Sequence, residues 1–388
     1  MKTILFFPKL EPSKPFHYMP LSLLAAAAPM QKADLILIDE RVDDWYNLLL
    51  KHLPETKFFM CSVFTGYQLT RAYQISKWVK QNYSNVQIVW GGPHPTILPR
   101  QTLDSGIVDA VICGHVDYTK PMPWGLIDIH RYINPATERF IYLSSYGCPG
   151  HCTFCSNKCK RPWILLPMEK VETDIDSLMG LYPFKQVVLF DASTFTDKRR
   201  AKDINRIMLK HSLTWIADAR ACELYSAGAD YFKDFTGLQQ LTIGLESGSQ
   251  KVIDMMQKGR NHLKIYKKVA AMMAKTNIRM VSGVIFGCPG ETPEDIKQTI
   301  EYIKEIKQIN PNFYISTTFF RPLPETLMAD MAKSYGYQEP DTLEGWANQG
   351  EQGHYKYNEW QDVPWIVEAN KYRSIYEEFR QNNENLFI

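Results

Sequence analysis

The sequence lacks the features that would place the protein in a membrane or on a nucleic acid. Its 388 residues contain no apolar run of about 18 residues, which a membrane-spanning helix needs. The opening stretch MKTILFFPKLEPSKPF reaches a proline too early for a secretory signal. The formal net charge is only +2, so nothing favours nucleic acid or an anionic membrane electrostatically. We therefore expect a cytoplasmic protein with a small-molecule or peptide substrate and no membrane partner.

Paired cysteines of the disulfide-forming kind are also missing. The eight cysteines are scattered singly, except for a group between residues 148 and 159. Within that group Cys148, Cys152 and Cys155 have the spacing C-x3-C-x2-C. Three thiolates on one glycine-containing loop can bind three irons of a cubane cluster and leave the fourth iron open for chemistry. A structural zinc with Cys159 as its fourth ligand is the alternative.

The first third of the chain alternates short apolar runs with helical patterns. We predict strands over 4–7, 35–38, 58–63, 87–90 and 110–113, with helices over 21–28, 43–51 and 69–81. Such alternation predicts a doubly wound, five-stranded parallel sheet of Rossmann-like type. Ligands of these sheets bind at the carboxyl ends of the strands. The residues expected there include Ser62, Thr65 and the run from Gly91 to Pro95.

The middle of the chain repeats the alternation six times. The expected strands are 140–144, 186–190, 213–217, 240–244, 279–286 and 313–318, and helices over 171–181, 198–210 and 293–309 lie between them. Thr292 and Pro293 are typical of the start of a helix. Six units predict a partial (β/α)6 barrel with its chemistry at the carboxyl ends of the strands. The cysteine loop follows the first of these strands.

These strand ends, in their order along the chain, resemble the radical S-adenosylmethionine (SAM) superfamily. Phe154 precedes the third cysteine, Gly244 to Gly248 matches Gly-x-Glu-Ser-Gly, and Gly283 to Gly290 matches Gly-x-Ile-x-Gly-x-x-Gly. The Gly-Gly-Glu found in many members is absent. The resemblance implies a 4Fe–4S cluster on the three cysteines and SAM on its open iron. The residues that it implies for SAM binding are Phe154, Asp191, Ser193, Arg220, Glu246, Ser282, Gly283, Ile285 and Gly287. Arg220 would pair with the SAM carboxylate, Glu246 would accept from its amino group or ribose, and the backbone near Ile285 would bond the adenine.

The N-terminal segment resembles the cobalamin-binding domain that is fused to one large group of radical SAM enzymes. The resemblance implies cobalamin contacts from Ser62, Thr65, Gly91, Gly92, Pro93, His94 and Gly114. It departs from the pattern in two places. The Asp-x-His-x-x-Gly signature is missing, so cobalamin would bind without a lower histidine ligand. The segment after Gly114 is also shorter than the usual Gly-Glu-Gly-Glu linker.

The expected division of the chain is a cobalamin-binding-like domain over 1–122, a linker over 123–139, the partial barrel over 140–321 and a short, aromatic-rich helical cap over 322–388. Ile366 to Arg380 has helical spacing. Cys159 and Cys288 are expected to be incidental or buried thiols. A hydrogen donor to a substrate radical, or a ligand of a second metal centre, is the other interpretation.

The resemblance implies reductive cleavage of SAM to a 5′-deoxyadenosyl radical that abstracts hydrogen from an unactivated carbon, with C-methylation of a small-molecule or peptide intermediate as the outcome. Flavodoxin or ferredoxin would be the electron donor. The alternative is a non-methylating radical SAM reaction such as ring contraction, dehydrogenation, deoxygenation or cyclisation, with or without cobalamin, which the short segment after Gly114 favours. A noncatalytic iron–sulfur or zinc protein is a remote third possibility.

Overall fold

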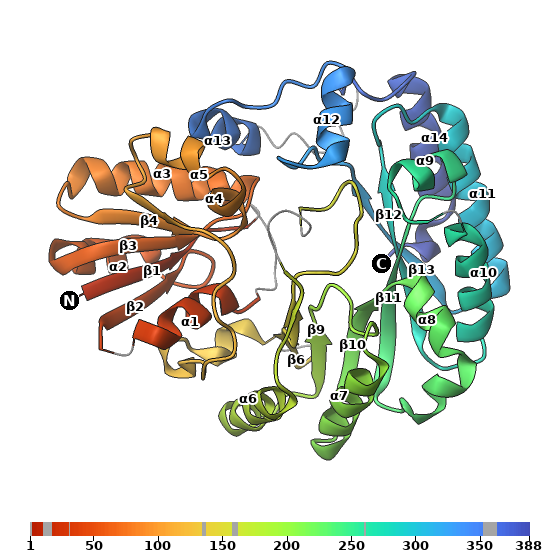
Figure 1. Cartoon of the computed structure of the whole chain (residues 1–388), viewed down its shortest axis with the longest axis horizontal. Helices are drawn as coiled ribbons and strands as arrows, with labels where there is room; N and C mark the ends of the chain where they lie inside the picture. The colour runs from red at the N-terminus through yellow and green to blue at the C-terminus, as the bar shows by residue number, and fades with distance from the viewer. Residues whose placement is uncertain are drawn as a thin grey trace.

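The computed structural model describes residues 2–10, 18–30, 32–133, 137–156, 162–259, 261–351 and 363–388. Two parallel sheets follow one another along the chain, and helices cover the outer side of the second, curved sheet (Figure 1). The predicted five-stranded and six-stranded parallel sheets are therefore confirmed.

The N-terminal sheet has the strand order β2-β1-β3-β4-β5, which places β1 and β3 inside it. Its elements are β1 Lys2–Phe7, α1 Leu21–Ala27, β2 Asp34–Asp39, α2 Trp45–His52, β3 Thr56–Ser62, α3 Tyr67–Asn82, β4 Gln87–Gly91, α4 Pro93–Ile97, α5 Pro99–Asp104 and β5 Ala110–Ile112. Ile4 to Phe6 have no exposed surface, because α3 covers one face of β1 and α1 the other (Figure 1). The residues from Pro93 to Ile97, which follow Gly91 and Gly92, form the short helix α4.

The second sheet has the order β13-β12-β11-β10-β9-β6. Its elements are β6 Arg139–Tyr142, α6 Met168–Leu181, β9 Gln186–Leu189, α7 Lys198–Lys210, β10 Thr214–Ala219, α8 Ala221–Ala227, β11 Leu238–Glu246, α9 Gln250–Met255, α10 His262–Met273, β12 Arg279–Phe286, α11 Pro293–Ile309 and β13 Phe313–Phe319. Helices α7 and α11 begin and end where the sequence predicts. The Thr292 hydroxyl caps α11 by accepting from the Asp295 N–H at 3.3 Å, and the Asp295 carboxylate accepts from the Thr292 N–H at 3.0 Å.

The C-terminal helices α12 Leu327–Ser334, α13 Leu343–Glu351 and α14 Ala369–Asn382 divide between the two sheets. Trp346 of α13 belongs to the hydrophobic core of the N-terminal sheet, and the Thr70 hydroxyl donates a hydrogen bond of 2.6 Å to the Ala347 carbonyl. Tyr372 and Tyr376 of α14 belong to the core of the second sheet. The predicted C-terminal helices are thus present, and α13 and α14 bury their apolar sides against different sheets. The aromatic residues between 352 and 362 lie outside the described residues.

The segment between the sheets is attached to the end of β2. The Tyr132 hydroxyl donates a hydrogen bond of 3.0 Å to the buried Asp39 carboxylate, and Arg131 forms an ion pair of 2.7 Å with Asp43. These contacts join the two sheets through the linker, although the domain boundaries at 122, 139 and 321 stay predictions.

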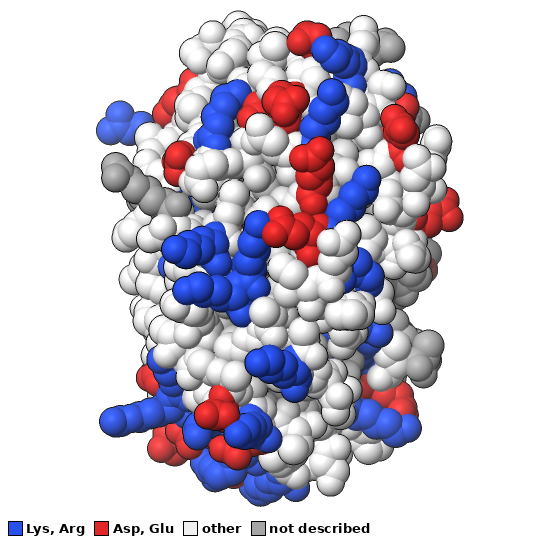
Figure 2. Space-filling model, turned by 90° about the vertical axis from the view of Figure 1, so that its right-hand side faces the viewer, with Lys and Arg blue, Asp and Glu red and all other residues white. Residues whose placement is uncertain are grey.

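The surface carries charges of both signs. On the face shown in Figure 2, lysine and arginine side chains gather around the middle and acidic side chains lie above them. No helix among the described residues is long and apolar enough to span a membrane. The view agrees with the small formal net charge of +2.

Candidate active site

The cysteine loop begins directly after β6, at the carboxyl end of the first strand of the second sheet. A short antiparallel ladder between β7 (Ser145–Tyr146) and β8 (Ile164–Leu165) closes its base. Cys148, Cys152 and Cys155 are half-buried and form no disulfide. The three predicted cluster ligands therefore share one loop at the edge where the chemistry of a parallel barrel is expected.

The described geometry bears on the zinc alternative. Among the described residues, no three or more His, Cys, Asp or Glu side chains are arranged around a single ion. A cubane cluster does not need such convergence, because each thiolate binds a different iron. Cys159, the fourth ligand of the zinc alternative, lies outside the described residues.

Asp191, which follows β9, holds the start of the cysteine loop. Its carboxylate accepts hydrogen bonds from the N–H groups of Ser144 at 2.7 Å and Ser145 at 3.0 Å. Arg200 of α7 donates to the carbonyls of Ser144 at 2.7 Å and Leu166 at 2.6 Å. Burial raises the pKa of Asp191, and the hydrogen bonds from Ser144 and Ser145 oppose the rise. The buried Asp191 carboxylate thus holds the loop, and a SAM contact from this residue stays a prediction.

The middle of the loop is attached to two helices. The Thr153 hydroxyl donates to the Met255 carbonyl at the end of α9 at 2.8 Å, and the Thr153 carbonyl accepts from the Met328 N–H at the start of α12 at 3.2 Å. Phe154 packs against the core of the second sheet. The loop between the second and third cysteines is thus fixed from both sides.

Glu246, at the end of β11, forms a nearly buried ion pair with Lys258. Lys258 Nζ lies 3.0 Å from Glu246 Oε1, and the two side chains are 7% and 13% exposed. Glu246 has a φ of 66°, a strained conformation for a residue with a side chain. A Cβ at Gly244 would overlap its carboxylate, and a Cβ at Gly283 would lie 3.8 Å from it. The glycines of the two matched motifs therefore leave room for the Glu246 carboxylate.

Lys258 is a site residue that the sequence reasoning missed. Burial would lower its pKa, but the Glu246 carboxylate and the Cys152 thiol outweigh this, so the pKa is raised. Burial raises the pKa of Cys152, while the positive charges of Lys258 and Arg220 act against the rise. Its sequence context, twelve residues after Glu246 and just beyond α9, resembles an ordinary surface helix end, so the sequence carried no local signal for it.

Arg220 begins α8 next to the cysteine loop. A Cβ at Gly150 would lie 3.6 Å from its guanidinium, and the part of the chain that the structure describes contains no ion-pair partner for it. The Glu223 carboxylate accepts from the Arg220 N–H at 3.2 Å and from the Ser193 hydroxyl at 2.6 Å. The buried Ser193 hydroxyl thus supports the cap of α8 through Glu223, and its contact with SAM stays a prediction.

The residues of β12 fall on two faces, because side chains alternate along a strand. The Ser282 hydroxyl is buried and bonded to the Tyr266 hydroxyl of α10, on the helix side. Gly283 lies beneath Glu246, and Ile285 shares that face. The Gly287 N–H and carbonyl are bonded to Tyr372 and Trp365 from the C-terminal segment. The polar groups of Ser282 and Gly287 thus have partners within the protein, and their contacts with SAM stay predictions.

The carboxyl edge of the N-terminal sheet brings together the residues predicted for cobalamin. They follow three adjacent strands: Ser62 and Thr65 after β3, Gly91 to His94 after β4 and Gly114 after β5. Gly66 and Gly114 have no atoms within 4 Å of where a Cβ would be. This part of the edge is open and, among the described residues, has no buried charged side chain at the three strand ends.

His94 is the exception within this group. Its side chain is fully buried, Nδ1 lies 3.0 Å from the Thr65 hydroxyl, and its ring packs edge-on against Trp346 at 5.8 Å between centroids. Burial lowers the pKa of His94 to about 3, so the ring is neutral. The prediction that His94 contacts cobalamin is corrected, because α13 covers it.

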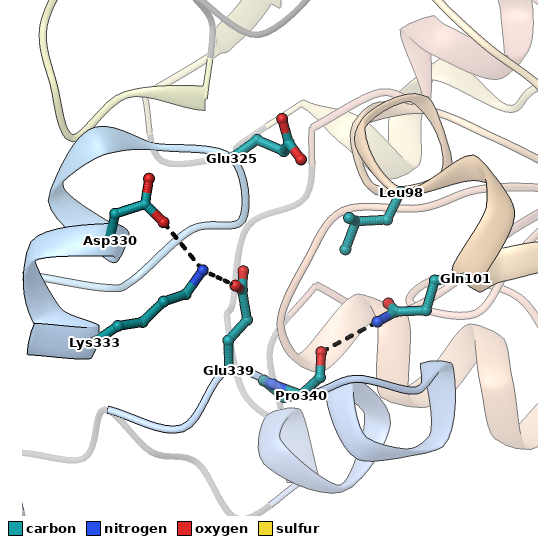
Figure 3. A pocket seen from close by; sticks show the side chains of 7 residues that line it. All are labelled: Leu98, Gln101, Glu325, Asp330, Lys333, Glu339 and Pro340. Atoms are coloured by element: carbon teal, nitrogen blue, oxygen red, sulfur yellow. Dashed lines mark hydrogen bonds and ion pairs between the residues drawn. The ribbon is translucent and has the colours of Figure 1, made fainter. Parts of the chain in front are cut away.

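A cavity of about 250 Å³ lies between the N-terminal domain and α12. Figure 3 shows its lining residues, which are Leu98, Gln101, Glu325, Asp330, Lys333, Glu339 and Pro340. Lys333 bridges Asp330 and Glu339, and Gln101 Nε2 donates to the Pro340 carbonyl at 3.1 Å. None of the predicted site residues lines this cavity. It is a space at the junction between the N-terminal domain and α12.

Two family descriptions match consecutive parts of the chain. Residues 11–121 match the B12 binding domain and residues 142–303 match the radical SAM superfamily. The two matches cover the two sheets and include the cysteine loop. This chain is a radical SAM enzyme with an N-terminal B12-binding domain.

Relatives of this radical SAM enzyme include proteins named as methyltransferases. An uncharacterized methyltransferase of Pyrococcus horikoshii is 24% identical over 67% of this chain and 66% of its own length. The bacteriochlorophyllide d C-12(1)-methyltransferase of Chlorobaculum tepidum is 22% identical over 84% of this chain and 76% of its own. The chain thus spans just under two thirds of the length of the Pyrococcus relative.

Two solved structures have the same fold. The radical SAM methyltransferase TsrM from Kitasatospora setae, with cobalamin and a [4Fe–4S] cluster bound, has a TM-score of 0.68 at 12% identity, and 99% of each chain is covered. The cobalamin-dependent SAM radical enzyme OxsB, with aqua-cobalamin bound, has a TM-score of 0.63 at 17% identity and covers 99% of this chain and 61% of its own. The arrangement of both sheets is therefore shared with cobalamin-containing enzymes.

The residues present fit the cofactors of the family, which are a 4Fe–4S cluster, SAM and cobalamin. The positive charges of Lys258 and Arg220 act on the Cys152 thiol and favour its thiolate form. The Arg220 guanidinium lies beside the cysteine loop at Gly150, and a guanidinium suits a carboxylate such as that of SAM. At the N-terminal edge, the bare α-carbons of Gly66 and Gly114 leave open surface for a large ligand.

Proposed function

We propose that this chain is a cobalamin-dependent radical SAM methyltransferase that acts on an unactivated carbon of a small-molecule or peptide substrate. The observation that carries the proposal is the pairing, in one chain, of a cysteine loop flanked by charged side chains with an open surface at the ends of β3, β4 and β5, where the described residues include no buried charge. The methyltransferase names of two relatives support it.

The residues proposed to bind each cofactor follow from their positions. Cys148, Cys152 and Cys155 would hold the cluster. When bound, the reduced cluster supplies the electron that cleaves SAM, and cobalamin supplies the methyl carrier. Ser62, Thr65, Gly91, Gly92, Pro93 and Gly114 would line the cobalamin surface.

The chain's own part in the reaction is to bind, orient and exclude water. Arg220 would pair with the SAM carboxylate, and Lys258 would hold the Glu246 carboxylate in position to accept from the SAM amino group or ribose. Gly283 and Ile285 would give the adenosine part a flat surface. In Figure 1 the strands of the N-terminal sheet run toward the middle of the molecule, where the cysteine loop lies, so the substrate is expected between the two edges.

An enzyme of this family needs a substrate and a reductant. We propose flavodoxin or ferredoxin as the reductant. Its identity can be tested by replacing dithionite with each protein in the assay below.

The test uses the protein purified without oxygen and loaded with iron, sulfide and cobalamin. It is incubated with dithionite, methyl-labelled SAM and a protein-free extract of small molecules and peptides. We expect 5′-deoxyadenosine and S-adenosylhomocysteine together, with the label in an extract component. 5′-Deoxyadenosine without S-adenosylhomocysteine would overturn methyl transfer in favour of a non-methylating reaction. A corrinoid-free preparation that forms product equally well would overturn the role of cobalamin.

A further inference from the structure

The C-terminal segment lies directly on the turn that follows β12. Trp365 Nε1 donates to the Gly287 carbonyl at 2.9 Å, and the Gly287 N–H donates to the Tyr372 hydroxyl at 3.0 Å. Two main-chain bonds continue the contact, from the Gly290 N–H to the Trp365 carbonyl at 2.8 Å and from the Val367 N–H to the Glu291 carbonyl at 3.1 Å. We call residues 287–291 the β12 turn. Four hydrogen bonds thus connect it to a segment about 80 residues later in the chain.

The shape of the turn depends on the same segment. Gly287 has a φ of 74°, and a Cβ there would lie 3.0 Å from Ile366 Cδ1. No side chain can be accommodated without moving Ile366. The C-terminal segment therefore packs against the α-carbon of Gly287 as well as bonding its polar groups.

A buried carboxyl group closes the turn from within. Glu291 is 1% exposed, and its Oε2 accepts from the Cys288 N–H at 2.8 Å. The Tyr372 hydroxyl is also a hydrogen-bond partner of the Glu291 carboxyl. Lys251 bonds the Gly290 carbonyl at 2.9 Å from the other side. The polar groups of the turn are thus almost all bonded within the protein.

The turn continues the strand that lies under Glu246. Gly283 and Ile285 precede the turn on the face toward the Glu246 carboxylate. A Cβ added at Gly283 would lie 3.8 Å from Glu246 Oε2. A shift of the turn would therefore shift the end of β12 against Glu246. The C-terminal segment can therefore change the position of Gly283 and Ile285 without itself contacting a ligand.

We propose that Trp365 and Tyr372 are positioning residues of the SAM site, which hold the β12 turn so that Gly283 and Ile285 face the adenosine part of SAM. The inference rests on the proposed function in assigning SAM to this surface. It makes the site incomplete without the segment 365–372, even though that segment lies beyond the matched radical SAM region at 142–303.

The test compares Tyr372→Phe and Trp365→Phe with a matched control, Tyr376→Phe. Tyr376 is one turn further along α14, where its hydroxyl bonds Thr317 at 3.2 Å and its ring, which the control variant keeps, packs edge-on against Phe286. The dissociation constant of SAM is measured by equilibrium dialysis on cluster-loaded protein, with iron content and cobalamin affinity measured in parallel. Each of the first two variants removes one partner of a buried main-chain group, so we expect about tenfold weaker SAM binding. The KM for SAM should rise by a similar factor with little change in kcat.

Iron content and cobalamin affinity should stay at the wild-type level in all three variants, and Tyr376→Phe should bind SAM within about twofold of wild type. Unchanged SAM affinity in both Tyr372→Phe and Trp365→Phe would overturn the inference. An equal loss in Tyr376→Phe would overturn it too, since general loosening of α14 would then be the cause. If wild-type protein binds SAM but makes no S-adenosylhomocysteine, the proposed methyl transfer fails while the binding comparison still decides this inference.

Discussion

The carboxyl edges of the two sheets are built from different kinds of residue. At the edge of the second sheet, nearly buried charges are matched or bonded, as Glu246 is with Lys258 at 3.0 Å and Asp191 is with the cysteine loop. At the ends of β3, β4 and β5 in the first sheet, the residues predicted for cobalamin are uncharged, and His94 among them is buried and neutral. The buried charges of the first sheet lie instead at the end of β2, where Asp39 pairs with Arg41.

The difference reflects the ligands that each edge suits. Buried charges are costly unless paired, so they persist where a charged ligand or a metal cluster needs them. SAM is a small ligand with an ammonium group and a carboxylate, so it suits an edge that carries buried charges. An open, uncharged surface with bare glycines suits a large ligand that is held by contact area. The predictions below test whether the two edges can be damaged separately.

Loss of a cysteine in the loop should have the largest effect. Cys148→Ala leaves two thiolates for the cluster, so we expect iron and sulfide to fall to near background and SAM cleavage to stop, with cobalamin binding unchanged. Iron analysis reports on the edge of the second sheet, and corrinoid absorbance reports on the edge of the first sheet. Both are measured in one sample. Cys222→Ala, at an exposed cysteine of α8, is the control. Full iron content in Cys148→Ala would contradict the assignment of the loop.

Lys258→Met should have the second-largest effect. It leaves the Glu246 carboxylate nearly buried without its cation, which costs about 3 kcal/mol in the free energy of unfolding. Chemical denaturation of the metal-free protein measures this loss, and SAM affinity should fall with it. Lys258→Arg keeps the charge and should retain most of the stability. Adding Glu246→Gln to Lys258→Met should recover part of the loss, and no recovery would argue against the pair.

Gly92→Ala should damage only the N-terminal edge. Gly92 has a φ of 97°, and a Cβ would lie 2.8 Å from the Val63 nitrogen. We expect a loss of about 2 kcal/mol and roughly tenfold weaker cobalamin binding, with normal iron content. Gly106→Ala, before β5, is the matched control, because its φ is 68° but nothing lies within 4 Å of where a Cβ would be. Equal effects of the two changes would show that contact with Val63 is unimportant.

Glu291→Gln should have the smallest effect, visible only as a change in pH dependence. Burial raises the pKa of Glu291 to about 7, while Cys288 and Tyr372 oppose the rise and Asp295 adds to it. Because the folded pKa is above the unfolded value, this group stabilises the fold fully below the unfolded pKa, and that contribution is lost as the pH rises toward 7. Glutamine resembles the protonated carboxyl.

Glu291→Gln should therefore flatten the decline in the denaturation midpoint between pH 5 and 7 relative to wild type. Stability at pH 5 should change little. Asp218, whose pKa is raised to about 6 mainly by burial, leaves a residual slope in both proteins. Identical slopes in the two proteins would mean that Glu291 does not titrate in this range.

Much of the architecture could be predicted because its signals are local. Helix α11 follows from Thr292, Pro293 and its apolar spacing, and both sheets follow from the alternation of strand and helix patterns. The cysteine spacing and the Gly-x-Glu-Ser-Gly match depend only on neighbouring residues. The carboxyl ends of parallel strands meet at one edge, so the order of the strand ends placed Arg220 and Glu246 near the loop.

The partners of individual side chains could not be predicted, because they depend on residues far away in the sequence. Asp191 and Ser193 looked like SAM contacts, yet each binds a main-chain or carboxylate group of the protein. Lys258 gave no sign that it would enter the core beside Cys152. Burial decides these roles, and burial is a property of the packed chain.

The sequence by itself determined the two parallel sheets, their order, and the loop with three cysteines, since periodicity and spacing are written along the chain. Only the tertiary structure decided where the C-terminal helices lie, with α13 over His94 on the first sheet and α14 on the β12 turn of the second. The physical reason is that an amphipathic helix specifies an apolar side but not which surface will bury it. That choice comes from the contacts that the folded sheets present.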